Sequence, residues 1–277
     1  MLALAALGSA AGFLAGLLGV GGALVMIPFL TFLLHHLSLS TDLSVKMAIA
    51  TGMSTIVVTS IASARTHHKA GSVRWDLFKG LAPGLVAGSL LSSLWLFAVL
   101  KGSTLALVFS VFCAFSATQI WRDRKPKASR QMPGTLGQAA VGMVIGLFAG
   151  LVGAGGAFIS VPFMTWCNVP LRQAVGTSAA LGFPIALTNA LGYVVTGWLA
   201  TDTPPHSLGF VWLPGFLTIS ICTVITAPMG ARLAQRMPLA RLKRSYAVLL
   251  YLLAFTRSEE HTSELQSQSI ISYAVFC

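Results

Sequence analysis

The stretch GFLAGLLGVGGALVMIP, residues 12–28, decides the fold, because a near copy of it returns 134 positions later as GLFAGLVGAGGAFISVP, residues 146–162. Five glycines, the alanine pair Ala23 and Ala157, and the proline keep the same register in both copies. Further along the chain, AIAT ending at Thr51 parallels AVGT ending at Thr177. Repetition at this length predicts two homologous halves.

The composition around these copies is that of a membrane protein. Of the 277 residues, 55% are hydrophobic and 9% are charged, whereas roughly a quarter of an ordinary soluble domain is charged. The mean hydropathy is +0.80. The net charge of +11 comes from short loops between apolar runs, which is typical of cytoplasmic loops and excludes a nucleic-acid binder. A soluble enzyme and a disordered chain are excluded as well.

The apolar runs predict an all-α polytopic membrane protein. As one straight helix, the first run, residues 2–34, would be about 50 Å long against a hydrocarbon core of roughly 30 Å, so we expect it to fold back at its glycines into a hairpin. Residues 136–166 repeat this pattern. The predicted parts are a first repeat at 1–121, a linker at 122–135 and a second repeat at 136–256, with further helices at 45–64, 77–100, 104–121, 174–200, 209–230 and from 245 onward.

Loop charges predict the topology. Basic residues are concentrated in the segments 65–79, 122–135 and 231–244, whereas Asp202 is the only one of the Asp, Glu, Lys and Arg residues in 201–208. The positive-inside rule places the three basic loops in the cytoplasm. Equivalent loops of the two halves then carry opposite charge patterns, which predicts inverted repeats.

The glycine breaks are the predicted functional site. Unpaired backbone is tolerated at membrane depth only where it faces protein or a water-filled cavity. A half-helix that begins there directs N–H groups and a positive dipole end at an anion. Close helix packing is the alternative for such glycines, and we assign it to the upstream set. The break glycines are Gly19, Gly21, Gly22, Gly153, Gly155 and Gly156, and the upstream set is Gly8, Gly12, Gly16, Gly142, Gly146 and Gly150.

The pattern G-L-x-G-x-G-G-A-x-x-x-x-P, present twice and followed each time by a Thr-containing motif, resembles the TauE/SafE family of sulfite exporters. The resemblance covers residues 8–256. It implies a multi-pass permease of the bacterial inner membrane that exports sulfite, organosulfonates or related small anions. Gly52 departs from the family pattern, which has serine after the threonine, as Ser178 does in the second copy.

Polar residues inside the apolar runs complete the predicted substrate-binding set. A single hydroxyl in a helix can bond the carbonyl one turn back. Thr51, Thr177 and Ser178 stand out because they occupy the repeated motif, and Asn189 because a buried amide costs more than a hydroxyl. No catalytic residue, metal or cofactor is predicted, because the four cysteines are far apart and the pairs His35–His36 and His67–His68 are expected to be solvated loop residues.

These features predict alternating access around the paired breaks, with a small anion and the lipid bilayer as partners. A passive anion channel or a membrane assembly protein that does not transport is the alternative. A membrane-embedded enzyme comes third, since the sequence holds no HExxH or GxSxG motif. The sequence leaves open whether the chain forms a homo-oligomer.

Residues 257–277 differ in composition from everything before them. RSEEHTSELQS, residues 257–267, and ISYAVFC, residues 271–277, are translations of a widely used sequencing adapter. We therefore predict that this tail is artefactual and that the last native helix is cut near Thr256.

Overall fold

The computed structural model describes residues 2–18, 22–37, 39–121, 131–153, 155–198 and 203–236. These residues are almost entirely helical, and five helical segments are long and apolar enough to cross a membrane. The helices are α1 Leu2–Leu18, α2 Ala23–His36, α3 Thr41–Lys69, α4 Trp75–Leu91, the π-helical turn η1 Ser92–Leu96, α5 Phe97–Val99, α6 Gly102–Trp121, α7 Thr135–Val152, α8 Ala157–Trp166, α9 Leu171–Trp198 and α10 Leu213–Arg236. The predicted all-α polytopic fold is confirmed.

Both predicted glycine breaks coincide with helix ends. α1 stops before the first break and α2 starts after it, and α7 and α8 flank the second break in the same way. A Cβ on Gly22 would press on Ala11 and Ala15 of α1. The start of α2 therefore lies back against the middle of α1, as a fold-back hairpin requires.

The upstream glycines pack helices of different halves together. A side chain on Gly8 or Gly16 would overlap Ile219 or Ala227 of α10. A side chain on Gly146 would likewise overlap the backbone of Leu85 in α4. The pairs α1–α10 and α4–α7 therefore meet backbone to backbone, and the packing role predicted for these glycines is confirmed.

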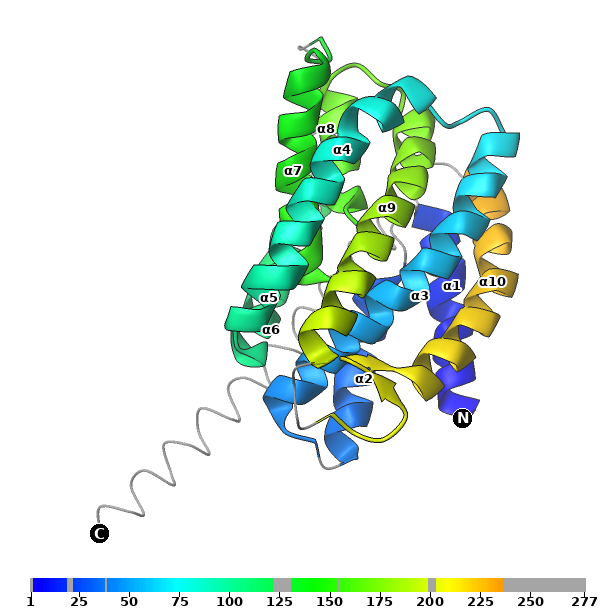
Figure 1. The fold of residues 1–277 in the computed structure, drawn as a ribbon. Coiled ribbons are helices and arrows are strands. Elements are labelled where there is room, and N and C mark those ends of the chain that lie inside the picture. The colour runs from blue at the N-terminus through cyan, green and yellow to red at the C-terminus, as the bar shows by residue number, and fades with distance from the viewer. Residues whose placement is uncertain are drawn as a thin grey trace.

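Each of these pairs is parallel, and equivalent helices of the two halves run in opposite directions. In Figure 1, α1, α3 and α10 rise from the bottom of the view to its top, while α7, α9 and α4 descend. The ends of α3 and α10 and the start of α7, which adjoin the three basic segments in the sequence, therefore lie at one end of the molecule (Figure 1). This placement supports inverted repeats, which stay a prediction.

The core lies where α3 and α9 pack against each other near the middle of the bundle. α3 is the most buried of the long helices. A short antiparallel hairpin of β1, Ser207–Leu208, and β2, Val211–Trp212, lies between α9 and α10 at the opposite end of the molecule from the end of α3 (Figure 1). Phe210 of this hairpin is buried and packs edge-on against Phe97.

The prediction of a solvated His67 is wrong, and several other predictions concern residues that the structure does not describe. His67 is not solvated: the residue is 3% exposed, because its ring turns inward from the last turn of α3 and meets the backbone of Gly16 in α1. His35, His36 and His68 are exposed as expected. The linker residues 122–130, the segment from 237 and the tail 257–277 lie outside the described residues, so the predicted domain boundaries and the artefactual tail stay predictions.

The glycine contacts predict a sharp difference between two alanine substitutions. In Gly16→Ala the new methyl group overlaps the carbonyl oxygen of Ala227, so α1 and α10 must separate, and overpacking of this kind costs about 1–3 kcal/mol. In the control Gly134→Ala nothing lies within 4 Å. We expect the thermal unfolding midpoint of the purified protein to fall for the first variant and to change little for the second. Equal midpoints would refute the close approach.

The opposed helix directions predict opposite labelling of two exposed positions. In a background without native cysteines, His68→Cys marks the end of α3 and His206→Cys marks the hairpin before α10. We expect a membrane-impermeant maleimide added to intact cells to label only His206→Cys, and to label His68→Cys only after the cells are opened. Labelling of both positions from the same side would contradict the inverted arrangement.

Candidate functional site

The half-helices α2 and α8 begin in the same way. Gly22 before α2 has φ 73° and ψ −8°, and Gly156 before α8 has φ 73° and ψ −6°. This left-handed conformation strains any residue with a Cβ, which explains why glycine stands at both positions. No side chain of the described residues caps either helix. The positive N-terminal end of each helix therefore has no side-chain acceptor among the described residues, and in α8 the Ile159 N–H bonds back to the Gly156 carbonyl at 3.2 Å.

The second break reaches into the first half. Gly153 ends α7, also in the left-handed region with φ 72°, and its α-carbon faces Ile27 of α2 and Ile49 of α3. Gly155 is buried, and its carbonyl oxygen lies 3.9 Å from the position of a Cβ on Gly182. The break is thus enclosed by elements of both halves.

Ser178 reaches the start of α8 through a partner. Its hydroxyl lies 2.8 Å from the hydroxyl of Ser160 in α8, and both side chains are buried. The first half lacks this pair: the position equivalent to Ser160 is Met26, whose sulfur accepts a 3.5 Å hydrogen bond from Thr55. The two breaks share their backbone geometry but differ in polarity, and the second is the more polar.

Thr51 and Thr177 connect the halves reciprocally. The N–H of Trp212, next to the start of α10, donates to Thr51 Oγ1 at 2.9 Å. The N–H of Arg74, next to the start of α4, donates to Thr177 Oγ1 at 2.9 Å. Both bonds use an oxygen lone pair and leave the hydroxyl proton as a donor. The structure therefore gives these threonines a role at helix starts, and their predicted role in binding a substrate stays a prediction.

Asn189 sits in a polar cluster against the last turn of α7. Its Nδ2 donates to the Ile185 carbonyl at 2.8 Å, while Oδ1 has no hydrogen-bond partner among the described residues. Asn189 Oδ1 and Ser92 Oγ both lie so near Gly150 that a Cβ there would overlap them. Tyr193 donates its hydroxyl proton to the Gly150 carbonyl. Ser92 Oγ is also buried without a partner among these residues. Unpaired buried oxygens point to a bound water or polar ligand.

Sequence reasoning missed Ser92, Tyr193 and the relation of this cluster to the first half. The spacing of 126 positions that relates Thr51 to Thr177 also relates His67 to Tyr193 and Ser63 to Asn189. The His67 ring meets the backbone of Gly16, as Tyr193 meets that of Gly150. Following the repeat beyond the threonine motif would have found these pairs.

Lys46 was missed as well. It stands five residues before Thr51 in α3, and its Nζ lies 5.8 Å and 5.9 Å from the ring centroids of Phe97 and Phe210. The aromatic faces stabilise a cation that lies inside a largely apolar helix. Arg172 occupies the same position before Thr177, but its side chain is exposed.

Gly19 and Gly21 lie outside the described residues, so their geometry is untested. The remaining predicted residues divide into three groups: Gly22, Gly153, Gly155, Gly156 and Ser178 at the breaks, Asn189 at the last turn of α7, and Thr51 and Thr177 at helix starts. Within the described residues, no group of three or more His, Cys, Asp or Glu side chains could hold a metal ion. The arrangement offers backbone N–H groups and hydroxyls, which bind rather than transform a ligand.

Comparison with known proteins agrees with this chemistry. The family model described as sulfite exporter TauE/SafE matches residues 4–256, up to the residue before the predicted artefactual tail. A probable membrane transporter protein of Haemophilus influenzae is 32% identical over 248 residues, which are 89% of this chain and 94% of the relative. The probable membrane transporter protein YunE of Bacillus subtilis is 30% identical over 71% of this chain and 80% of its own.

A more distant relative is the probable membrane transporter protein MJ0441 of Methanocaldococcus jannaschii, 23% identical over 81% of this chain and 83% of its own. No solved structure matches the chain significantly. The names of these relatives describe membrane transporters, which are not enzymes.

The bond between Arg74 and Thr177 predicts a specific effect on stability. Thr177→Val removes the acceptor at nearly constant volume and leaves a partly buried N–H unpaired, which costs about 1–3 kcal/mol. Thr177→Ser keeps the hydroxyl and serves as the control. We expect the unfolding midpoint in detergent to fall for valine and to stay near the parent value for serine. Equal behaviour of the two variants would refute this role.

Proposed function

The chain belongs to the sulfite exporter TauE/SafE family, and we propose that within this family of membrane transporters it exports a small anion, such as sulfite or an organosulfonate, by alternating access. The observation that carries the proposal is the pair of uncapped half-helices that begin at Gly22 and Gly156 inside the bundle. Two positive helix ends enclosed by protein suit an anion far better than a cation or a neutral solute.

The second break offers the best ligands for such an anion. The start of α8 combines an uncapped, positive helix end with the buried hydroxyls of Ser160 and Ser178. An oxyanion accepts hydrogen bonds from both kinds of donor. The first break, lined by Met26 in place of a serine, contributes backbone donors and an apolar wall.

Alternating access is supported by the way the halves are joined. The glycine faces bind α1 to α10 and α4 to α7, so each packed pair contains one helix from each half. The described residues of the breaks lie between these pairs, against α3 and α9. Rocking of one pair against the other would expose the breaks to one side at a time. We place the protein in the bacterial inner membrane with the linker 122–135 in the cytoplasm.

Transport of labelled sulfite tests the proposal. The protein is reconstituted in phosphatidylcholine vesicles, and the initial rate is measured against sulfite concentration with and without unlabelled sulfite on the far side. A carrier saturates and is accelerated by the far-side anion. A rate that stays linear and ignores the far side would favour the passive channel, and no flux above empty vesicles would refute anion transport.

Ser178→Ala locates the site in the same assay. Loss of one hydroxyl donor costs about 1 kcal/mol, or about fivefold in kcat/KM. Thr165→Ala is the matched control, because Thr165 lies on the same helix as Ser160 but, among the described residues, bonds only carbonyls of that helix. We expect the control to transport at the parent rate. Equal rates for Ser178→Ala and the control would remove Ser178 from the site.

A further inference from the structure

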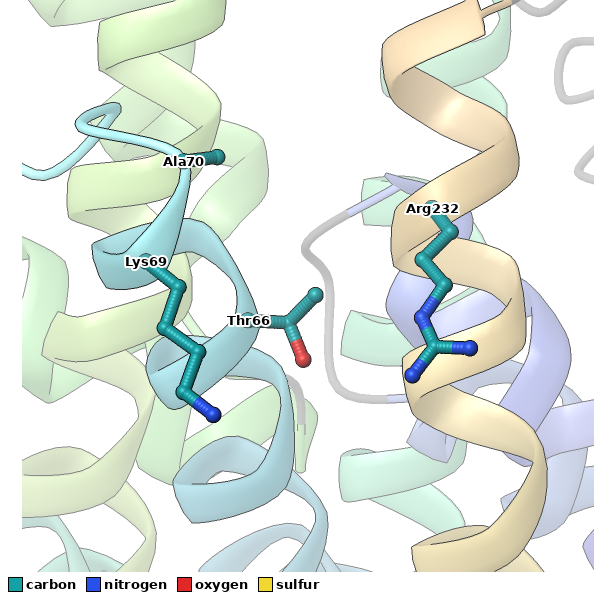
Figure 2. A pocket seen from close by; sticks show the side chains of 4 residues that line it. All are labelled: Thr66, Lys69, Ala70 and Arg232. Atoms are coloured by element: carbon teal, nitrogen blue, oxygen red, sulfur yellow. The ribbon is translucent and has the colours of Figure 1, made fainter.

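A pocket of about 300 Å³ lies between the end of α3 and the end of α10, and its described lining is Thr66, Lys69, Ala70 and Arg232. Figure 2 shows Thr66 pointing from α3 toward α10, with the guanidinium of Arg232 on the other side of the gap and Lys69 along the same flank of α3. Two cations and a hydroxyl thus border the pocket, and this lining contains no carboxylate.

Neither cation has a counter-ion among the residues that the structure describes. The ion pair found in the described part of the chain joins Arg74 to Asp76, and neither Lys69 nor Arg232 takes part in it. Like charges on facing helices repel, and this repulsion is relieved when an anion lies between them. Arginine and lysine also provide several donors each for oxygen ligands.

Polar groups continue from the pocket into the protein. Ser63 lies one turn before Thr66 on α3, on the face shared with Ala70. Its Oγ and the Nε2 of the neighbouring His67 are buried and have no hydrogen-bond partner among the described residues. The side chains of Ser63 and His67 are 4% and 3% exposed. Since His67 also meets the backbone of Gly16, these groups lie between the pocket and the last turn of α1.

We propose that this pocket captures a small oxyanion from the end of the molecule where α3 and α10 finish, before the anion moves inward past Ser63 and His67 to the glycine breaks. The proposal rests on the proposed function, since it assigns the first binding step of the same export. The ligand chemistry is a singly or doubly charged oxyanion that accepts hydrogen bonds from Lys69 and Arg232, while the Thr66 hydroxyl, which donates to the Ala62 carbonyl at 3.0 Å, forms a polar border of the pocket. A phosphate headgroup of a lipid shares this chemistry, and the test separates the two.

The test measures KM and kcat for labelled sulfite in phosphatidylcholine vesicles. Loss of a charged donor weakens binding by about tenfold, so we expect Lys69→Gln and Arg232→Gln each to raise KM by about that factor with a smaller change in kcat. Lys79→Gln is the matched control: it removes an exposed cation near the start of α4, outside the pocket lining, and should leave both constants unchanged. Lys69→Arg and Arg232→Lys keep the charge and should recover most of the affinity.

Each outcome decides between the proposals. If the parent protein shows saturable flux and the pocket variants match Lys79→Gln, the capture site is refuted while the proposed function stands. If the parent shows no flux, the proposed function itself fails. If the effect of the variants appears only when phosphatidylglycerol is added to the vesicles, the pocket holds a lipid headgroup and the capture of free anion is refuted. Monodisperse elution of every variant shows that folding is intact.

Discussion

The structure depends on one constraint: the helices of two pairs, α1 with α10 and α4 with α7, approach each other so closely that a side chain does not fit at the glycines of the contact. Added methyl groups on Gly16 or Gly84 would overlap backbone carbonyls of α10 or α7. Lipid offers no hydrophobic drive for helix association, so such contacts gain their stability from dispersion and close fit. Because each contact joins the two halves, the same glycines that fix the helix pairs also enclose the breaks between them.

The sequence predicts the breaks well and the pairing poorly. Repetition, helix length and the cost of unpaired backbone locate the starts of α2 and α8 to within a residue, since glycine has a physical reason to stand there. The partner of a glycine-lined helix face cannot be predicted from that face, because Gly8 and Gly142 have no side chain that could specify a partner. That each of these helices packs against a helix of the other half becomes apparent only in the three-dimensional structure.

The candidate site shows the same division. Thr51 and Thr177 attract attention because they repeat, yet repetition preserves a bond to a helix start as readily as a bond to a ligand. His67 looks like a loop residue because residue type and position in the chain carry no information about the neighbouring α1 and α10. Ser178 shows its relation to the second break only through Ser160, a contact between residues that are 18 positions apart.

The parallel pairing of α1 with α10 has a consequence for biosynthesis. When α7 leaves the ribosome, its glycine-accepting partner α4 is already in the membrane. Among the described helices α1 is made first, but its partner α10 is made last. During nearly the whole of translation, α1 therefore presents a bare backbone face to lipid or to the insertion machinery. Assembly of this pair brings the first and the last of the described helices together.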